Sequence, residues 1–249
     1  MPKARRRALV TTTALLALLA SASPAVPAPV SALLRAPITA HHHGDGVLHG
    51  TSSNWSGYTA TGGKFTAVSA DWVQPAVSCT STDAWSAFWV GLDGDGSKTV
   101  EQIGTEADCS SGAPVYSAWY EMYPAYPTDL KNPVRPGDHF TASVTTNGSG
   151  SFTLTLRNTT AGWSRVVAKS LKDAALASAE VVAEAPSSLF GVLPLADFGT
   201  VDFTGAAVNG HPLGASNPAS VDMAEDGVAK ATTSELSSGT DFSVTWHHS

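Results

Sequence analysis

Short stretches in which apolar and polar residues alternate follow one another roughly every ten positions from about position 50 onward. Gly, Pro, Asn and Asp separate the stretches, and the apolar spacing of an amphipathic helix is nearly absent. This pattern is typical of an antiparallel β-sandwich or barrel. The predicted strands are residues 65–73, 87–92, 115–123, 139–145, 151–158, 164–170, 177–184 and 240–246.

Turn-forming residues also predict one connection and one loop. Asn147-Gly-Ser-Gly150 stands between two alternating runs and is a strong hairpin signal. We therefore expect strands 139–145 and 151–158 to pair. Residues 209–218, which contain several Gly and Pro residues, are predicted to be a loop.

Two glutamates, Glu180 and Glu184, lie four residues apart in an apolar run, with Val182 midway between them. In an extended strand this spacing places all three side chains on one face. Carboxylates avoid half-buried strands unless another group pairs with them or uses them. Gln102, a polar residue in a second apolar run, is a candidate partner. The pattern indicates an active site on the face of a sheet.

The N-terminal 22 residues have the three parts of a secretory signal peptide. Basic residues at positions 5–7 precede an apolar run over residues 8–20, and Ala20-Ser-Ala22 offers a small-residue cleavage site. The apolar run is too short to span a membrane. Residues 23–50, rich in Pro, Ala, His and Gly, are predicted to be a propeptide or flexible leader, and residues 51–249 a β-sandwich catalytic domain. We expect a secreted, extracellular monomer that does not associate with membranes.

The charge of the chain is unevenly distributed. Five of the 14 Lys and Arg residues, and none of the 21 Asp and Glu residues, precede position 45, so the remaining chain carries a formal charge of −12. Such a surface repels nucleic acid and anionic lipid, and neither is an expected partner. It suits acid conditions, in which carboxylates are protonated and repel one another less. The solubility of an exported protein would explain it equally well.

Cys79 and Cys109 are the only cysteines. In an oxidising compartment an even pair favours a disulfide, which here would bracket Gln102. The sequence has no His-Glu-x-x-His motif, no Gly-x-Ser-x-Gly elbow and no P-loop. We therefore expect neither a metal nor a cofactor, and we expect carboxyl and amide groups to carry any chemistry.

Six short segments stand in a set order along the chain. They are Asn54-Trp-Ser-Gly-Tyr58, Asp71-Trp-Val-Gln-Pro75, Phe88-Trp-Val-Gly-Leu-Asp-Gly94, Glu101-Gln-Ile-Gly-Thr105, Ala118-Trp-Tyr-Glu-Met-Tyr-Pro124 and Ser178-Ala-Glu-Val-Val-Ala-Glu184. Each is weak alone, but in this order they make the chain resemble the glutamic peptidases, or eqolisins. The resemblance extends from about the first of these segments to the C-terminus.

The resemblance implies an all-β, concanavalin-like sandwich of two antiparallel sheets, with a polypeptide substrate across the concave face. It also implies a pepstatin-insensitive acid endopeptidase whose catalytic pair is Gln102 and Glu180. Positions expected to bind substrate or support the site are Trp89, Asp93, Trp119, Glu121, Tyr123 and Glu184. Three residues depart from the usual family pattern, namely Ser117, Met122 and Val181. These departures leave the implied chemistry intact but bear on substrate preference and on the acidity of the optimum.

The chemistry of the pair supports the same function. Peptide hydrolysis needs a base that deprotonates water and a donor that stabilises the developing oxyanion. An amide such as that of Gln102 does not titrate, so it still donates in acid. Glu180 would take a proton from water and then pass it to the leaving nitrogen. An unperturbed glutamate titrates near ~4.3, so hydrogen bonds must lower its pKa if it is to act in stronger acid.

Two other functions remain open at this stage. A glycoside hydrolase needs two carboxylates across the scissile bond, and Glu121 with Glu180 or Glu184 could supply them. Gln102 would then have no role. A lectin-like binding module, including an inactive relative of the peptidases, would use the same aromatic face without turnover. A Gln102 amide too far from Glu180 to share one water molecule would favour the binding module.

Overall fold

The computed structural model describes residues 39–41, 49–188 and 191–249. The predicted signal peptide and most of the predicted leader lie outside these ranges. The strands are β1 (Thr39–His41), β2 (His49–Ser52), β3 (Trp55–Thr61), β4 (Ala67–Val73), β5 (Ala87–Leu92), β6 (Val100–Ser110), β7 (Ala113–Tyr123), β8 (Thr128–Asp129), β9 (His139–Thr146), β10 (Ser151–Asn158), β11 (Trp163–Ser170), β12 (Ser178–Glu184), β13 (Ser187–Ser188), β14 (Gly191–Val192), β15 (Thr200–Val208), β16 (His211–Pro212), β17 (Ala219–Glu225), β18 (Val228–Thr233) and β19 (Phe242–Trp246).

The eight predicted strands are all confirmed, with ends that differ by no more than two residues. The predicted hairpin at 147–150 is confirmed by antiparallel pairing of β9 with β10. The predicted loop at 209–218 contains the short strand β16 and a 3-10 helix, Leu213–Ser216. None of the helical structure in the described ranges is long and apolar enough to cross a membrane.

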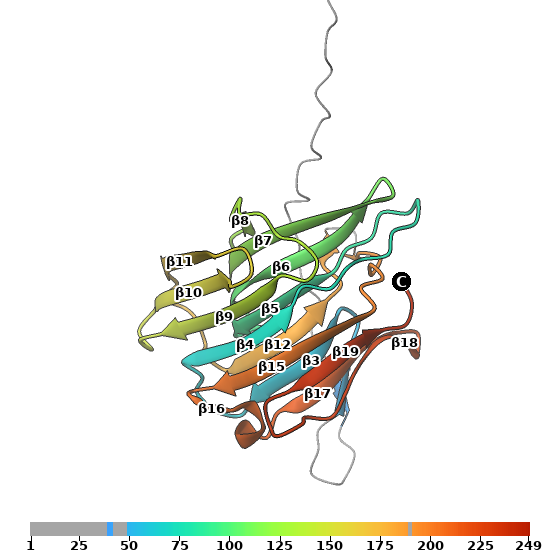
Figure 1. Ribbon diagram of the computed structural model, residues 1–249. Helices are drawn as coiled ribbons and strands as arrows, with labels where there is room; N and C mark the ends of the chain where they lie inside the picture. Colours follow the sequence, from blue (N-terminus) through green and yellow to red (C-terminus); the bar gives the residue numbers. More distant parts are fainter. Residues whose placement is uncertain (1–38, 42–48, 189–190) are drawn as a thin grey trace, which may run out of the picture.

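Strand pairing runs through the fold in one unbroken path. It passes from β8 through β7, β6, β5, β12, β3, β17, β18, β19, β15, β4, β9 and β10 to β11, and every pair on this path is antiparallel. At β17–β18–β19 the sheet folds back on itself, which produces two stacked layers (Figure 1). The predicted sandwich of antiparallel sheets is therefore confirmed. The β2 strand lies outside this path and pairs in parallel with β17.

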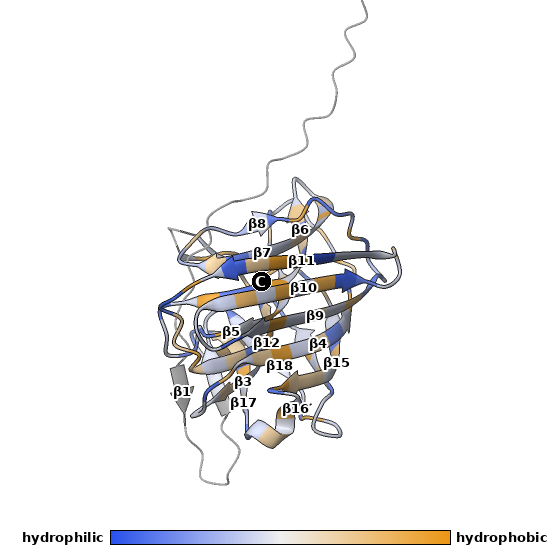
Figure 2. Cartoon of the chain, turned by 90° about the vertical axis from the view of Figure 1, so that its left-hand side faces the viewer, coloured by the Kyte–Doolittle hydropathy of each residue, from blue (hydrophilic) through white to orange (hydrophobic). Residues whose placement is uncertain are grey.

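The main core lies between the two layers. Val90, Ile103 and Val181 reach it from the first layer, and Phe140 and Leu154 reach it from the second. Alternate residues of the second layer point outward, so hydrophobic and hydrophilic bands alternate along β10 (Figure 2). Because one face of each strand is buried in this core, the register of each strand is strongly specified.

The outer face of the first layer carries a second, smaller apolar cluster. Its buried members are Trp55, Ala87, Trp89, Val100, Trp119 and Val182, and Tyr123 packs against it. The middle strands of this layer, β3, β5 and β12, are buried on both faces. Such strands read as nearly continuous apolar runs. The carboxylates and amides of interest are embedded in this second cluster.

A disulfide joins Cys79 to Cys109, as the sequence predicts. Cys109 lies near the end of β6, the strand that carries Gln102. The bond ties this end of β6 to the irregular segment that follows β4.

Glu101 places an acidic side chain on the core-facing side of β6, where it is completely buried. Burial, together with the negative charge of Asp93, raises the pKa of Glu101 to about 8. Below pH ~4.5 the group is protonated in both the folded and the unfolded chain, and between that pH and about 8 only the unfolded chain ionises. Stability therefore falls as pH rises through this window, by about 1.4 kcal/mol per pH unit for this one group.

We predict that Glu101→Gln flattens this pH dependence, because glutamine matches the neutral acid in shape and does not ionise. Free energies of unfolding from denaturant titrations at pH 4.5, 6 and 7.5 would show a smaller loss of stability in the variant. Glu235→Gln, at an exposed position, serves as the control and should follow the wild type. Parallel curves for the wild type and Glu101→Gln would contradict the prediction.

Candidate active site

One row of directly opposed residues crosses five neighbouring strands of the first layer. Its members are Glu121 on β7, Gln102 on β6, Gly91 on β5, Glu180 on β12 and Thr59 on β3. Directly opposed residues of antiparallel strands project from the same face. Gln102 and Glu180 therefore point to the same side of the sheet. They lie two strands apart, which is about 10 Å between their Cα atoms.

Gly91 lies between Gln102 and Glu180, and its lack of a side chain makes room for the Trp89 ring above it. A Cβ atom at this position would lie 2.8 Å from the Trp89 ring and 3.1 Å from Cβ of Gln102. The first distance is shorter than any ordinary contact, so a side chain here would displace the indole, the amide or both. The glycine is therefore required by its neighbours and not by its backbone angles.

Glu121 holds the amide of Gln102. The Nε2 atom of Gln102 donates a hydrogen bond to Oε2 of Glu121, and both side chains are buried. This contact assigns Glu121 the role of orienting Gln102. Glu121 shares a face with Trp119 and Tyr123, each of which lies two residues away on β7.

Glu180 is completely buried. Burial raises the pKa of its carboxyl group well above the ordinary value, and the negative charges of Asp95 and Asp93 raise it further. The Ser178 hydroxyl and the Asp95 backbone N–H offset part of this effect. Within the described ranges neither carboxylate oxygen has a hydrogen bond of normal geometry. New donors at Glu180, such as water or a substrate N–H, would therefore favour its ionised form.

Three tryptophans surround the row, and Glu184 fixes one of them. Glu184 Oε2 accepts a 2.7 Å hydrogen bond from Trp89 Nε1, and its Oε1 accepts one of 3.3 Å from Asn54 Nδ2. The ring of Trp55 meets that of Trp89 edge-on, with centroids 5.1 Å apart and an angle of 81°. Trp119 belongs to the same cluster. Glu184 thus acts through Trp89, whose indole lies over Gly91.

Asp93 lies directly after β5 and supports the site from that end of the strand. Its carboxylate accepts hydrogen bonds from the backbone N–H groups of Leu176 at 2.8 Å and Ala177 at 2.7 Å. Its own N–H donates to the carbonyl of Ser178 at 3.0 Å. These bonds tie the end of β5 to the start of β12 and so fix the position of Glu180. Asp93 has φ 65°, in the left-handed region that Asp adopts more readily than most residues.

Sequence reasoning missed four residues of the site, namely Trp55, Thr59, Gly91 and Asp95. Thr59 Oγ1 donates to Asp95 Oδ2 at 3.1 Å beside Glu180. Trp55 lies in the apolar cluster that surrounds the row. One signal was present, because Trp55 and Thr59 are an even number of residues apart on a strand, which places them on one face.

The three departures from the family pattern fall on different faces. Val181 and Met122 belong to the core between the layers, so they alter packing there and do not line the row. Ser117 lies on the same face as Glu121, and its hydroxyl donates to Glu106 Oε2 at 2.8 Å.

Comparison with known proteins shows the family to which the chain belongs. Residues 53–246 match the Peptidase A4 family. The chain belongs to the peptidase A4 family.

Its relatives include peptidases of known structure. Aspergillopepsin-2 from Aspergillus niger is 30% identical over 221 residues, which cover 78% of each chain. Scytalido-glutamic peptidase, crystallised with a transition-state analogue inhibitor, aligns with a TM-score of 0.69 and 27% identity over 79% of this chain and 99% of that one. SCP-B, an eqolisin crystallised with the tripeptide Ala-Ile-His, aligns with a TM-score of 0.65 and 26% identity over the same shares. The A4 peptidase described here is therefore of the glutamic type.

We predict that Gly91→Ala lowers kcat/KM on a peptide by roughly 10- to 100-fold, because an added methyl group displaces Trp89 or Gln102 from the row. Kinetics on a quenched fluorescent peptide would measure the loss. Circular dichroism and thermal unfolding would show whether the sandwich is retained. Full activity in a folded Gly91→Ala variant would show that the space above this glycine is not needed.

Proposed function

We propose that this A4 peptidase is a secreted endopeptidase that hydrolyses peptide bonds in acid through a water molecule held between Glu180 and Gln102. The observation that carries the proposal is the shared row, in which both groups project from one face with only a glycine between them. The signal peptide inferred from the sequence and the disulfide both suit an exported protein.

The two side chains would divide the reaction between them. The raised pKa of the resting group runs against the lowered pKa that action in strong acid requires, so the ionised form must be favoured by donors that arrive with water or substrate. In that form Glu180 accepts a proton from the water as it attacks the scissile carbonyl, and then delivers that proton to the leaving nitrogen. Gln102 donates an N–H to the oxyanion. An amide nitrogen has two hydrogens, so donation to Glu121 still allows donation to substrate. Glu121 would keep the amide in the orientation in which nitrogen, not oxygen, faces the oxyanion.

Several buried carboxyl groups favour action in acid. The pKa of Glu101 is raised to about 8 by burial and by Asp93, and burial, with the neighbouring charge of Glu106, also raises the pKa of Asp108. Each group costs stability once the unfolded chain can ionise, so the folded state is favoured at low pH. The formal charge of −12 from position 45 onward acts in the same direction.

The aromatic residues beside the row suit an extended peptide. Trp55, Trp89 and Trp119 form an apolar surface next to the dyad, and aromatic side chains offer large contact areas to a ligand. The two solved relatives carry a transition-state analogue and a tripeptide. By analogy we expect polypeptides as substrates.

The decisive variants are Glu180→Gln and Gln102→Ala. We expect Glu180→Gln to abolish cleavage of a denatured protein at about pH 4, since the base is lost. Gln102→Ala should lower kcat about 10²- to 10³-fold, the usual effect of removing one oxyanion donor. Mass analysis of the fragments would measure both, and pepstatin should leave the wild type active because no catalytic aspartate pair is used.

Glu235→Gln, at an exposed site, is the matched control for this assay and should cleave normally. Near-normal cleavage by folded Glu180→Gln would refute the proposed mechanism. Turnover of a polysaccharide, with no action on denatured protein, would instead favour a glycoside hydrolase.

A further variant tests the electrostatics of Glu180. The negative charge of Asp95 is one cause of the raised pKa of Glu180, so Asp95→Asn should lower that pKa. The acid limb of kcat/KM, which reports the base of the free enzyme, should then move to lower pH by up to about one unit. Asp173→Asn, at an exposed position, should leave the limb in place. An unchanged or upward-shifted limb in Asp95→Asn would count against Glu180 as the base.

A further inference from the structure

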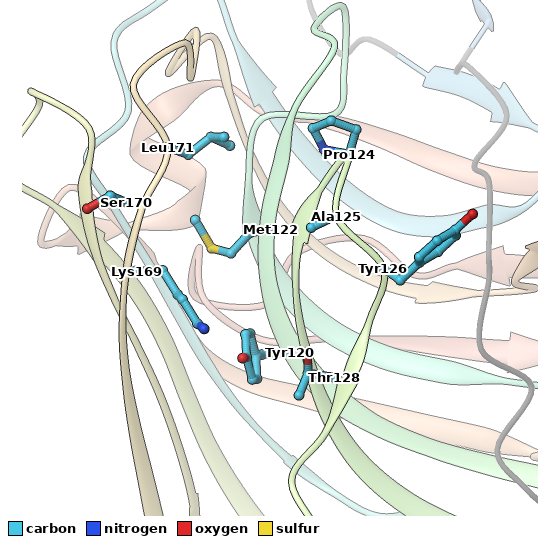
Figure 3. A pocket seen from close by; sticks show the side chains of 9 residues that line it. All are labelled: Tyr120, Met122, Pro124, Ala125, Tyr126, Thr128, Lys169, Ser170 and Leu171. Carbon is cyan, nitrogen blue, oxygen red and sulfur yellow. The ribbon is translucent and has the colours of Figure 1, made fainter.

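The folded-back sheet leaves one side of the sandwich unclosed. Its two ends are β7 with β8 and the edge strand β11, and no pairing joins these ends in the part of the chain that the structure describes. We call this side the open seam. A pocket of about 370 Å³ occupies it (Figure 3). Its lining residues are Tyr120, Met122, Pro124, Ala125, Tyr126, Thr128, Lys169, Ser170 and Leu171.

One part of this seam pocket is polar and positively charged. The Lys169 ammonium lies 5.2 Å from the centroid of the Tyr120 ring, and Figure 3 shows the Lys169 side chain directed toward that ring. Burial raises the pKa of Tyr120, but hydrogen bonding by Thr128 and the charge of Lys169 outweigh it, so the pKa is lowered. No carboxylate among the described residues forms an ion pair with Lys169. Among the described residues, the pocket thus contains a cation that contacts Tyr120 but has no carboxylate partner.

The remainder of the pocket is apolar. Met122 and Leu171 pack against the main core, and Pro124 and Ala125 form the neighbouring wall. In Figure 3 the Met122 side chain points into the space between β7 and β11, whereas the Tyr126 ring points away from the other side chains. A ligand that fits this lining has an anionic end and a compact apolar body.

Basic residues gather along the same edge of an otherwise acidic protein. Five of the nine Lys and Arg residues after position 45 lie on β10, on β11 or in the segments next to the seam. They are Lys131, Arg157, Arg165, Lys169 and Lys172. Lys131 pairs with Asp129 at 2.6 Å, which leaves this region with a positive balance that attracts anions.

We propose that the seam pocket binds the carboxyl-terminal residue of a peptide whose last side chain is apolar. The carboxylate lies at Lys169, with the Tyr120 and Thr128 hydroxyls beside it, and the side chain packs on Met122 and Leu171. The proposal rests on the proposed function, because hydrolysis of a polypeptide produces such carboxyl ends. A peptide carboxyl group titrates near ~3.3–3.7, so it is still charged in mild acid, where lysine is also charged.

The position of the pocket connects it to the dyad. Along β7, Trp119 and Glu121 project to the outer face, whereas Tyr120 and Met122 project to the core and the seam. A product end in the pocket therefore contacts the reverse side of the strand whose Glu121 holds Gln102. The seam pocket is thus a product site separated from the catalytic row by the thickness of one sheet.

The test uses full-length Glu180→Gln protein, so that binding is measured without turnover and independently of the catalytic proposal. The probes are N-acetyl-L-leucine, N-acetyl-L-leucinamide, which lacks the charge, and octanoate, which lacks the peptide group. Titration at pH 5, followed by the NMR signal of the Met122 methyl group, reports binding at this pocket. We expect the acid to bind about five- to tenfold more tightly than the amide, as one charged contact provides.

Two further lysine variants in the same background complete the experiment. Lys169→Met should remove the preference for the acid over the amide, and Lys172→Met, three residues along at another exposed lysine, should retain it. Equal affinity for the acid and the amide, an unmoved Met122 signal, or an undiminished preference in Lys169→Met would overturn the proposal. Tighter binding of octanoate than of N-acetyl-L-leucine would also overturn it, in favour of a fatty-acid site.

Discussion

The antiparallel register of β6, β5 and β12 is the constraint on which the rest of the site depends. Gln102 and Glu180 are both opposed to the same residue, Gly91, so the pairing alone determines that they share a face and a row. A slip of one residue in either pairing would turn one side chain into the main core. Burial of both faces of β5 and β12 makes such a slip costly.

Around this row the sheet gives neighbouring side chains different roles. Residues on the outer face position the proposed dyad, because Glu121 hydrogen-bonds Gln102 and Glu184 hydrogen-bonds Trp89. Asp93 acts from the strand end, where it ties the start of β12 to β5. The same alternation directs Tyr120 and Met122 to the open seam. One strand, β7, therefore serves the catalytic face and the seam pocket at once.

Sequence alone predicted the parts of this structure that depend on local pattern. Alternation located the eight predicted strands, and the spacing of Glu180 and Glu184 indicated a shared face. The predicted strands did not include β3, which is buried on both faces but, unlike β5 and β12, contains Ser, Gly and Thr instead of an apolar run, and the role of Trp55 was missed with it. They did not include β15, β17 or β18 either. The ordered motifs pointed to Gln102 and Glu180, but their opposition across Gly91 depends on long-range pairing that no local pattern encodes. Sequence alone could not predict the open seam either, because the seam depends on where the two ends of the folded-back sheet lie.

The proposed mechanism differs from that of a hydrolase with two catalytic carboxylates, because one of its two groups is an amide that does not titrate. Glu180 must bind and release a proton, whereas Gln102 must donate a hydrogen bond regardless of pH. In the proposed mechanism both groups act on a single water molecule held between side chains on either side of Gly91. Because burial raises the pKa values of Glu101 and Asp108, the folded state is also more stable in acid, the condition in which the proposed reaction takes place.

The most direct test is a crystal structure of the active protein with a tetrahedral transition-state analogue. The account predicts that one oxygen of the tetrahedral centre accepts a hydrogen bond from Gln102 Nε2 and that another contacts the Glu180 carboxyl group, each at about 2.7–3.1 Å. An analogue bound with its tetrahedral centre away from Gly91, or in contact with only one of these two side chains, would contradict it.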